Sequence, residues 1–359
     1  MKMAVLMLAA FVAIASLIPF FRREAWWIRV FDFPRVQILA LALLSFGLGL
    51  FFWDLQTWQG RAALAAIAAA ILIQGASIFP YTPLARKEVL SATERDPEAT
   101  VSLLVANVLM NNRQSGRLLR MITEYQPDLL LLLEPDAWWA EKLRVLEEAG
   151  YVHSVKEPLD NRYGMLLYSR LPLLDPEVRY LLRPEVPSMH LRVQLRCGRW
   201  VWLHGVHPEP PSPTEADSTL PRDAELLIVG REVKDHDIPT IVAGDLNDVA
   251  WSYTTTLFQK ISTLLDPRKG RGMFNTFHAQ IPFMRWPLDH VFHSDHFLLD
   301  DMRRLPAFGS DHFPVFVRLL LQPAAAILQD GPTAYEEDEK TAHEKIAKAA
   351  ATHARARLI

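Results

Sequence analysis

The sequence predicts an α/β domain that follows three membrane-spanning helices. Three observations lead to this prediction. The long uncharged apolar stretches all precede residue 85. Beyond them, short β-branched or leucine-rich runs are interspersed with helical patterns, as in an α/β domain. Polar residues directly follow several of these runs, which places polar side chains where loops leave the sheet.

Three uncharged stretches occupy residues 3–21, 36–53 and 62–80. Each is close to the roughly 20 apolar residues needed to cross a bilayer. Aromatic residues typical of a membrane–water interface lie near their ends: Trp26, Trp27, Trp53, Trp58 and Tyr81. A cleaved signal peptide is the alternative for the first stretch, because Lys2 precedes it, but no clear small-x-small cleavage site follows. We therefore expect a membrane domain with three transmembrane helices at residues 1–84.

The basic residues of the short loops set the expected orientation of these helices. The first loop holds four arginines, and Arg86 and Lys87 follow the third stretch. The opposite side holds only Lys2 and Arg61. Positive-inside counting therefore predicts a multi-pass protein of the cell membrane, with the C-terminal domain in the cytoplasm.

The rest of the chain divides by composition into three segments. We expect a charged linker at residues 85–99, a globular domain at 100–322 and a charged, partly helical C-terminal tail at 323–359. Charge runs like that of the tail are typical of a solvated helix. The lone cysteine, Cys197, excludes an internal disulfide and a cysteine-based metal site, and we expect it to be a small buried hydrophobe.

The globular domain opens with a strand, a helix and a second strand. TVSLLVA reads as the first strand and runs into Asn107, SGRLLRMITEY has apolar residues at helical spacing, and PDLLLLL runs into Glu134. Such a unit implies a parallel strand pair joined by a right-handed crossover. Asp136 is placed to cap the next helix, which Gly150 is placed to end.

Further strands follow toward the C-terminus. YGMLLYS and MHLRVQLRC have strand patterns, and WVWLHGV runs into His207. A helical stretch around RDAELLIVGREVKDH leads to the strand TIVAG and then Asp245. Asp289 opens the strand HVFHS, while Asp311 and His312 open FPVFVRLLL. If these last two strands run antiparallel to the others, all of the polar ends meet at one rim, where ligand sites favour the loops of a rigid sheet.

These motifs resemble the endonuclease/exonuclease/phosphatase superfamily, the group of deoxyribonuclease I and exonuclease III. The segments that carry the resemblance are VANV, LLLLLEP, YGMLLYSRLPL, VHPEPP, VAGDLND, PLDHVF and GSDHFPV. They extend from about Val101 to Arg318, and GDLND together with SDHFPV is the most specific part. The resemblance implies a four-layer α/β sandwich of two mixed β-sheets flanked by helices, in a bacterial subgroup with N-terminal membrane spans.

The resemblance also implies metal-dependent cleavage of a phosphate ester. Glu134 resembles the principal metal ligand, Asn107 lies next to it, and Asp311 resembles a metal-side carboxylate. The expected ion is Mg²⁺, with Mn²⁺ as the alternative, because Mg²⁺ prefers oxygen ligands and keeps several waters. A zinc site is disfavoured, because the histidines concerned span a strand and a turn with no cysteine among them: His290, His293 and His296.

The remaining motif residues correspond to the catalytic groups of the superfamily. Asp245 resembles the residue that activates water or orients the nucleophile, and Asn247 resembles its phosphate-contacting neighbour. Asp289 resembles the partner that orients His312, and His207 falls where relatives often have the His of a Thr-His-Leu triplet. An imidazole bonded to a carboxylate stays protonated more readily, so His312 would stabilise the charge of a pentacoordinate transition state.

The substrate class stays open between nucleic acid and a phospholipid headgroup. The net charge of −3 gives no global signature of nucleic-acid binding. Arg222 and Arg285 are candidates for phosphate contact, with surface salt bridging as the alternative. The competing function is a catalytically silent phosphate-binding module or a sensor at the membrane. A transporter is disfavoured, because no charged residue lies within the spans. The sequence indicates no protein partner besides the bilayer.

Overall fold

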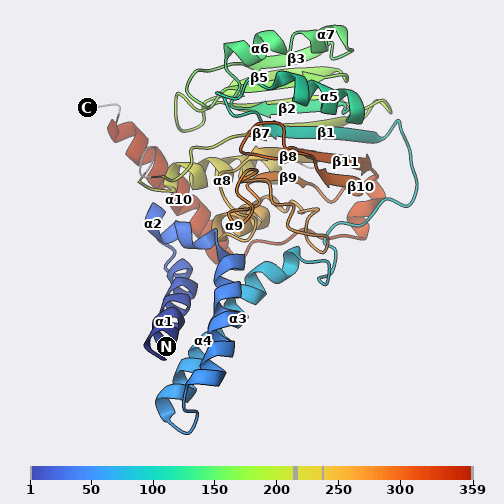
Figure 1. Cartoon of the computed structure of the whole chain (residues 1–359). Coiled ribbons are helices and arrows are strands. Elements are labelled where there is room, and N and C mark those ends of the chain that lie inside the picture. Colours follow the sequence, from blue (N-terminus) through green and yellow to red (C-terminus); the bar gives the residue numbers. More distant parts are fainter. Residues whose placement is uncertain (1, 213–216, 237, 357–359) are drawn as a thin grey trace.

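The structure is a computed structural model that describes residues 2–212, 217–236 and 238–356. Figure 1 shows two parts, a bundle of N-terminal helices and a β-sandwich at one end of it. The expected α/β fold with three long apolar N-terminal helices is confirmed.

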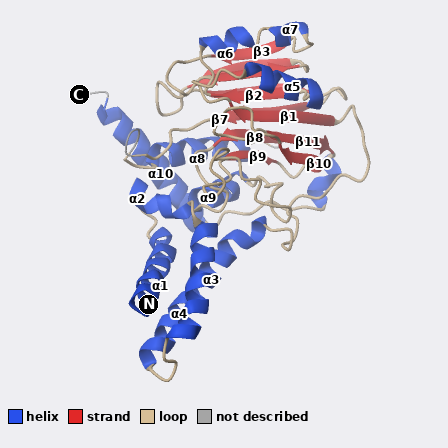
Figure 2. Ribbon diagram, viewed as in Figure 1, coloured by secondary structure: helices blue, strands red, loops and turns tan. Residues whose placement is uncertain are grey.

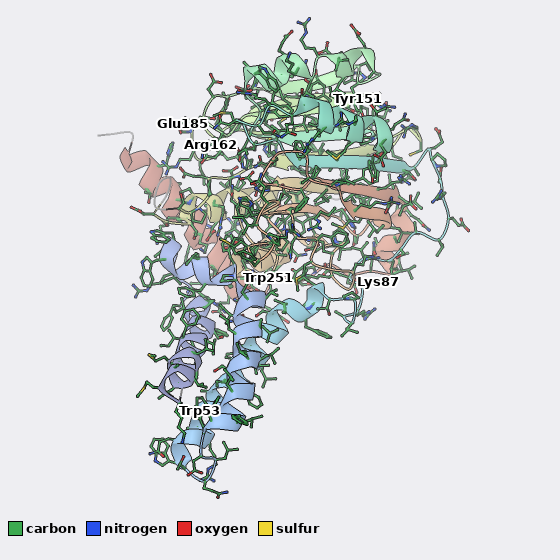
Figure 3. All side chains as sticks on the ribbon, viewed as in Figure 1. Trp53, Lys87, Tyr151, Arg162, Glu185 and Trp251 are labelled. Carbon is green, nitrogen blue, oxygen red and sulfur yellow. The ribbon has the colours of Figure 1, made fainter. Side chains whose placement is uncertain are left out.

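The apolar stretches form three helices that are long and apolar enough to cross a membrane. They are α1 (Lys2–Leu17), α3 (Arg35–Phe52) and α4 (Trp58–Ile78), with the short α2 (Trp26–Arg29) after α1. The turn between α3 and α4 holds Trp53 at the end remote from the sandwich (Figure 3). The loop between α1 and α3 bonds to the sandwich, because the Thr219 amide donates to the Glu24 carbonyl and the Trp26 amide to the Asp217 carbonyl. This loop and the sandwich therefore lie at the same end of the helices.

The first sheet has six strands with one parallel pair at its centre. β1 and β2 run parallel, with Val105 opposite Leu131, and α5 (Ser115–Tyr125) connects them as the sequence predicts. All other pairs in this sheet are antiparallel. In spatial order the strands are β10 (Phe297–Arg304), β11 (Val315–Leu321), β1 (Thr100–Asn107), β2 (Leu129–Leu133), β4 (Met165–Ser169) and β3 (His153–Glu157).

The second sheet has five strands, again with one parallel pair. β7 and β8 run parallel and are connected through α8 (Leu220–Lys234), whereas β8 and β9 are antiparallel. In spatial order the strands are β5 (Leu173–Arg179), β6 (Ser188–Gln194), β7 (Trp200–Val206), β8 (Thr240–Asp245) and β9 (Asp289–His293).

The core lies between the two sheets, and helices cover their outer faces (Figure 2). Leu103 and Leu131 of the first sheet pack in one cluster with Leu203 and Ile241 of the second. α5, α6 (Ala137–Lys142) and α7 (Val145–Glu148) lie on the first sheet, and α8 and α9 (Tyr253–Ser262) on the second. This arrangement gives the four expected layers of helix, sheet, sheet and helix.

The structure corrects one expectation from composition and shows which residues hold the segment 85–99. Cys197 is exposed rather than buried, because it lies in the turn between β6 and β7, beyond the last buried position at Leu195. Within residues 85–99, the expected linker, Val89 is fully buried and Ser91 forms a β-bridge with Leu299.

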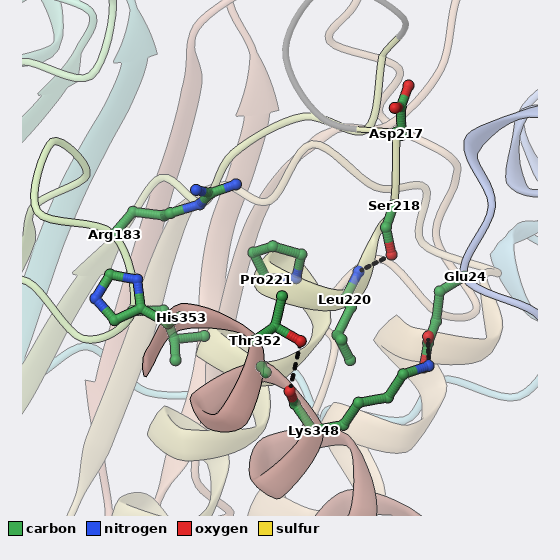
Figure 4. Close-up of a pocket in the computed structure, with 11 residues that line it drawn as sticks. Glu24, Arg183, Asp217, Ser218, Leu220, Pro221, Lys348, Thr352 and His353 are labelled. Atoms are coloured by element: carbon green, nitrogen blue, oxygen red, sulfur yellow. Dashed lines mark hydrogen bonds and ion pairs between the residues drawn. The ribbon is translucent and has the colours of Figure 1, made fainter. Parts of the chain in front are cut away.

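The C-terminal segment forms a charged helix, and one narrow face of it is buried. It forms α10 (Glu336–Ala356), which packs against α8 and α9. Ala342, Ile346 and Ala349 repeat at helical spacing and form a narrow apolar stripe that the surrounding charges obscure in the sequence. Near its end the helix forms one side of a cavity of about 420 Å³ facing the start of α8, where Lys348 pairs with Glu24 (Figure 4).

A buried ion pair fixes α10 to α8. The Lys345 ammonium lies 2.7 Å from Asp223 Oδ2, and Arg222 contacts the other carboxylate oxygen, Oδ1. Burial alone would raise the pKa of Asp223, but Lys345 and Arg222 outweigh it and lower that pKa.

We expect Lys345→Met to lower the free energy of unfolding by about 3 kcal/mol, because the Asp223 carboxylate loses one of its two buried cations. A fall in melting temperature of roughly 5–10 °C would be measured for the detergent-solubilised chain. Lys340→Met on the exposed face of α10 is the matched control. Equal shifts for both variants would show that α10 is not held by this pair.

Candidate active site

The strand ends of the two sheets meet at one rim. β1, β2, β7 and β8 end there, and β9 and the segment before β11 begin there, because β9 and β11 run antiparallel to their neighbours β8 and β1. The polar residues brought together at this rim are Asn107, Glu134, His207, Asp245, Asp289 and His312.

The turn after β8 holds the Asp245 carboxylate in place. Gly244 has φ +148°, and a Cβ there would lie 1.8 Å from the Val206 carbonyl oxygen, so only glycine allows β8 to approach β7 this closely. Asn247 has φ +50°, and its amide donates to Asp245 Oδ1 at 2.9 Å. The Asn247 side chain donates to the Pro208 carbonyl at 3.0 Å. Asp245 Oδ2 therefore points toward the rim with its geometry fixed by the backbone.

His312 lies between two carboxylates. Its Nδ1 is 2.7 Å from Asp289 Oδ2, and its Nε2 is 3.5 Å from Asp245 Oδ2. Burial alone would lower the pKa of His312, but Asp289 and Asp245 outweigh it and raise that pKa to about 10. Burial also raises the pKa of Asp245, a shift that the His312 imidazolium opposes. The result is a buried imidazolium beside a potential proton acceptor.

Glu134 has an oxygen that is suited to a metal ion. Its Oε1 accepts a hydrogen bond of 2.7 Å from Asn107 Nδ2, which also lies 3.2 Å from Asp245 Oδ2. The other oxygen, Oε2, is buried and has no hydrogen-bond partner among the residues that the structure describes. Burial raises the pKa of Glu134 to about 7 against the Asn107 hydrogen bond. A buried carboxylate oxygen without a donor fits a divalent cation, which would replace the missing partner.

The neighbouring carboxylates strengthen this fit. One carboxylate oxygen each of Asp245 and Asp289 and one ring nitrogen of His312 all lie within 4.8 Å of one another, and of these the carboxylates can ligate a cation, whereas the protonated imidazole cannot. Asp311 is half-buried, and its charge acts on both Glu134 and His312. Oxygen donors predominate in this set, as Mg²⁺ and Mn²⁺ prefer.

His207 lies beside the Asp245 carboxylate. Its Nε2 is 4.0 Å from Asp245 Oδ2, and its Nδ1 is buried without a partner in the described part of the chain. Burial lowers the pKa of His207, which favours the neutral imidazole. A neutral His207 is suited to a hydrogen bond with a substrate oxygen.

The two arginines proposed for phosphate contact are placed differently. The Arg222 side chain is 1% exposed and is engaged by Asp223, by Asp248 and by the Asn247 carbonyl. Its contacts with Asp248 and Asn247 hold the turn after β8. Arg222 is therefore better suited to orienting that turn than to contacting a phosphate. Arg285 is half-buried on a loop near the rim, where its guanidinium lies 5.1 Å from the centre of the Phe313 ring.

The histidines of the disfavoured zinc site do not converge. His290 bonds through Nδ1 to Arg268 and through Nε2 to the Asp248 carbonyl, while His293 bonds to the Ser294 carbonyl. A second group of potential metal ligands, on β6, β7 and α8, already has protein partners. There His190 and His204 bond to each other and Glu232 pairs with an arginine.

Three residues that the sequence did not single out also shape the site. Ser310 Oγ donates to the Asn107 carbonyl at 2.8 Å and accepts from the His312 amide at 3.0 Å. These two bonds link the end of β1, which carries Asn107, to the segment that carries His312. Thr276 Oγ1 accepts from the Asp289 amide, and the Phe277 ring lies 4.9 Å from the His312 ring. Ser310 lies inside the SDH motif, but Thr276 and Phe277 have no signal beyond their place in the fold.

Comparisons with solved structures agree with this architecture. An endonuclease/exonuclease/phosphatase from Beutenbergia cavernae is 18% identical, with a TM-score of 0.51 over 62% of this chain and 72% of that chain. The human Nocturnin catalytic domain is 17% identical, with a TM-score of 0.51 over 64% and 97%. A humanized TDP2 from D. rerio is 17% identical, with a TM-score of 0.51 over 62% and 99%. These likenesses show the fold.

The family assignment comes from the sequence match itself. A search among curated proteins finds no match. The family described as Endonuclease/Exonuclease/phosphatase matches residues 104–312, more than half of the 359 residues. The match includes every strand end that forms the rim. The chain therefore belongs to the Endonuclease/Exonuclease/phosphatase family of phosphoesterase hydrolases.

Proposed function

We propose that the protein is a membrane-anchored, divalent-metal-dependent phosphoesterase. The observation that carries the proposal is the convergence of Asp245, the Asp289–His312 pair and Glu134 at one rim. A proton acceptor, a buried cation and a candidate metal ligand there meet the needs of phosphate-ester hydrolysis. A silent phosphate-binding module, in contrast, has no use for a proton acceptor held beside an imidazolium.

Each group has a defined task in this proposal. Asp245 accepts a proton from the attacking water, because its Oδ2 faces the rim while its Oδ1 is held by the Asn247 amide. The His312 imidazolium stabilises charge that develops on the phosphoryl oxygens, and Asp289 keeps its orientation.

Glu134, Asn107 and Asp311 would hold Mg²⁺ or Mn²⁺ in the same proposal. When bound there, the ion supplies positive charge that offsets the negative charge of the phosphate ester. His207 donates a hydrogen bond to a substrate oxygen, as its neutral form allows. Asn247 contacts the phosphate only if its side chain leaves the Pro208 carbonyl.

The site is built directly on the membrane helices. Tyr81 at the end of the third candidate span donates to the Ala250 carbonyl at 2.6 Å. The Trp251 indole donates to the Asp32 carbonyl in the loop between α1 and α3 at 2.7 Å, and Figure 3 shows Trp251 at this junction. Both contacts are made by the segment that follows the Asp245 turn, so we propose that the catalytic rim works at the membrane surface.

We also propose a cytoplasmic location for the sandwich. Two of the first-loop arginines, Arg29 and Arg35, pair with the buried Asp32 and so have a structural use. Basic residues still predominate at this end of the helices, with Arg22, Arg23 and those after α4. A reporter that is active only outside the membrane, fused to the C-terminus, is expected to stay silent, and its activity would reverse the orientation.

The activity is expected to fall as the pH falls through about 7, the pKa of Glu134. Below that pH Glu134 is protonated and cannot ligate the metal, so protons and Mg²⁺ compete for the same carboxylate. Raising the Mg²⁺ concentration should therefore move the acid limb of the pH–rate profile to lower pH.

The variant Glu134→Gln tests this competition. Glu124→Gln, on the exposed face of α5, is its matched control. Glu134→Gln should raise the Mg²⁺ requirement by at least about tenfold and remove the effect of Mg²⁺ on the acid limb. An unchanged requirement would take Glu134 out of the metal site.

A substrate panel tests the proposed function. The full chain in detergent is incubated with Mg²⁺ or with a chelator, because removing residues 1–84 would expose the apolar surface around Trp251. The panel comprises DNA, RNA, phosphoinositides, sphingomyelin and simple phosphate esters, each also incubated with Asp245→Asn. Metal-dependent cleavage of at least one class, lost in the variant, supports the proposal, and no cleavage by the folded chain favours the silent module.

A further inference from the structure

An apolar groove of about 610 Å³ lies between the membrane helices and the catalytic rim. One wall comes from the segment that leads into α3, with Val30 and Phe33. The opposite wall is the loop 281–286, with Phe283 and Met284, and Trp286 forms part of the lining. Its volume is within the roughly 300–1,000 Å³ typical of ligand sites. The lining is mostly aromatic and aliphatic.

The groove is continuous with the surface that faces the bilayer. Its first wall runs directly into α3, one of the three candidate spans. The opposite wall carries Phe283, which is 75% exposed, and the Gln37 side chain of α3 donates to the Phe283 carbonyl at 2.7 Å. A soluble protein rarely leaves large apolar side chains exposed at the mouth of an apolar groove. Beside a span they are suited to contact with lipid.

Aromatic rings connect the groove to the active site. The Trp286 ring contacts Phe33 edge-on, with a centroid distance of 5.7 Å, and stacks on Phe277 at 6.1 Å. Phe277 in turn lies 4.9 Å from the His312 ring, and its backbone bridges to His312. The Trp286 and Phe277 rings therefore separate the groove from the proposed catalytic imidazolium, and the polar end of a molecule whose chain lies in the groove would reach it by extending past these rings.

We propose that the groove binds an acyl chain of a membrane phospholipid, so that the substrate is a lipid phosphate ester. This inference rests on the proposed function and names its substrate class. The lipid enters from the bilayer along α3, its chain lies against Val30, Phe33 and Met284, and its phosphate reaches Asp245 and His312. Hydrolysis then takes place without extracting the lipid fully into water.

The occupant follows from the chemistry of the groove. A nucleic acid requires a basic surface that tracks several phosphates, whereas none of the described residues that line the groove is Lys or Arg, although Arg285 belongs to the loop 281–286, and the net charge is −3. A protein segment would need the groove to be accessible from water, whereas its mouth lies beside a candidate span. An acyl chain needs neither a basic surface nor access from water, and the apolar lining of the groove would receive it directly from the bilayer.

The test compares phosphate esters that differ only in chain length. The probes are hexyl and hexadecyl p-nitrophenyl phosphate, a diester pair, and hexyl and hexadecyl phosphate, a monoester pair, in mixed micelles with the full chain. The measured quantity is the ratio of kcat/KM for the long chain to that for the short chain. Within each pair the reacting group is constant, so the ratio isolates chain binding from the chemistry.

The groove variants are Val30→Asn, Met284→Asn and their combination, at residues that are 46% and 43% exposed and so carry little of the core. Leu84→Asn is the matched control, because Leu84 is 86% exposed near the same end of the helices and outside the groove. We expect a ratio of at least about tenfold for the wild type and for Leu84→Asn, and a fall of about tenfold in the combined variant. If the long chain only tethers the substrate to the micelle, the kcat/KM ratio will be the same for the wild type, the groove variants and Leu84→Asn. That result would overturn the inference.

Labelling by a phospholipid with a diazirine in its acyl chain gives a readout that does not depend on catalysis. Labels within residues 281–286, reduced in the combined variant, support the groove as the chain site. Labelling without any metal-dependent hydrolysis would refute the proposed function and leave the groove in place. Hydrolysis with no chain-length ratio and no such label, or preferential cleavage of DNA or RNA, would refute the groove and leave the phosphoesterase in place.

Discussion

Replacing Asp245 by Asn is expected to lower kcat by at least about a hundredfold while the chain stays folded. The amide has the size of the carboxylate, and its oxygen still accepts the bond from the Asn247 amide. It cannot take a proton from water, and it removes the negative charge 3.5 Å from His312 Nε2. The loss therefore falls on the chemical step rather than on the fold.

The measurement is metal-dependent phosphate-ester hydrolysis under saturating substrate, with melting temperature as the check on folding. Asp330→Asn, at an exposed position outside the rim, is the matched control. If Asp245→Asn retains near-normal turnover, the proton acceptor is placed wrongly and the proposed mechanism fails.

Replacing His312 by Ala is expected to cost at least about a hundredfold in turnover, the scale of a charged group aimed at the transition state. The imidazolium is buried between Asp289 and Asp245, which hold its pKa at about 10. Its proton, and with it the activity, should be retained at neutral pH and lost as the pH rises through about 10. His343→Ala on the exposed face of α10 is the control and should have no effect.

The pH profile separates this electrostatic task from a structural one. Asp289→Asn removes the nearer of the two carboxylates, 2.7 Å from Nδ1, and so lowers the pKa of His312. The alkaline limb of the pH–rate profile should then move to lower pH. A limb that stays in place would mean that the proton on His312 is not the one that activity requires.

The sequence predicts the interior strands of both sheets and the edge strand β9, but it misses the other three edge strands. Runs such as Leu129–Leu133 are buried on both faces and are therefore uniformly apolar. The three strands without a sequence signal, β3, β5 and β10, all lie at sheet edges. There HSVKE and LLDPEVR carry polar and charged residues that suit solvent and discourage pairing with another chain.

The candidate site is predictable to the level of its motifs and no further. Strand ends can be read from the sequence, so the convergence of Asp245, Asp289 and His312 follows once the strand directions are known. The burial of Arg222 does not follow, because its partner Asp248 lies in the turn after β8, far from α8 in the sequence. Similarly, the packing of α10 depends on small alanines whose pattern is weak beside the charges.

The junction with the membrane helices has no sequence signature at all. Trp251 reads as an ordinary aromatic residue after GDLND, and Trp286 as part of a loop. Only the folded chain shows that Trp251 bonds to Asp32 and that Trp286 packs on Phe33. These contacts join the catalytic turn to the bilayer side of the molecule and lead to the lipid-ester proposal.

One measurement tests the central claim most directly, the release of product from phospholipid vesicles that contain the full chain. The vesicles carry wild type or Asp245→Asn and are assayed with Mg²⁺ and with a chelator. We predict headgroup or phosphate release by the wild type with Mg²⁺, and at least about a hundredfold less with the chelator or in the variant. Equal release under all conditions, or no release by a folded chain that also leaves soluble phosphate esters intact, would contradict a metal-dependent phosphoesterase at the membrane.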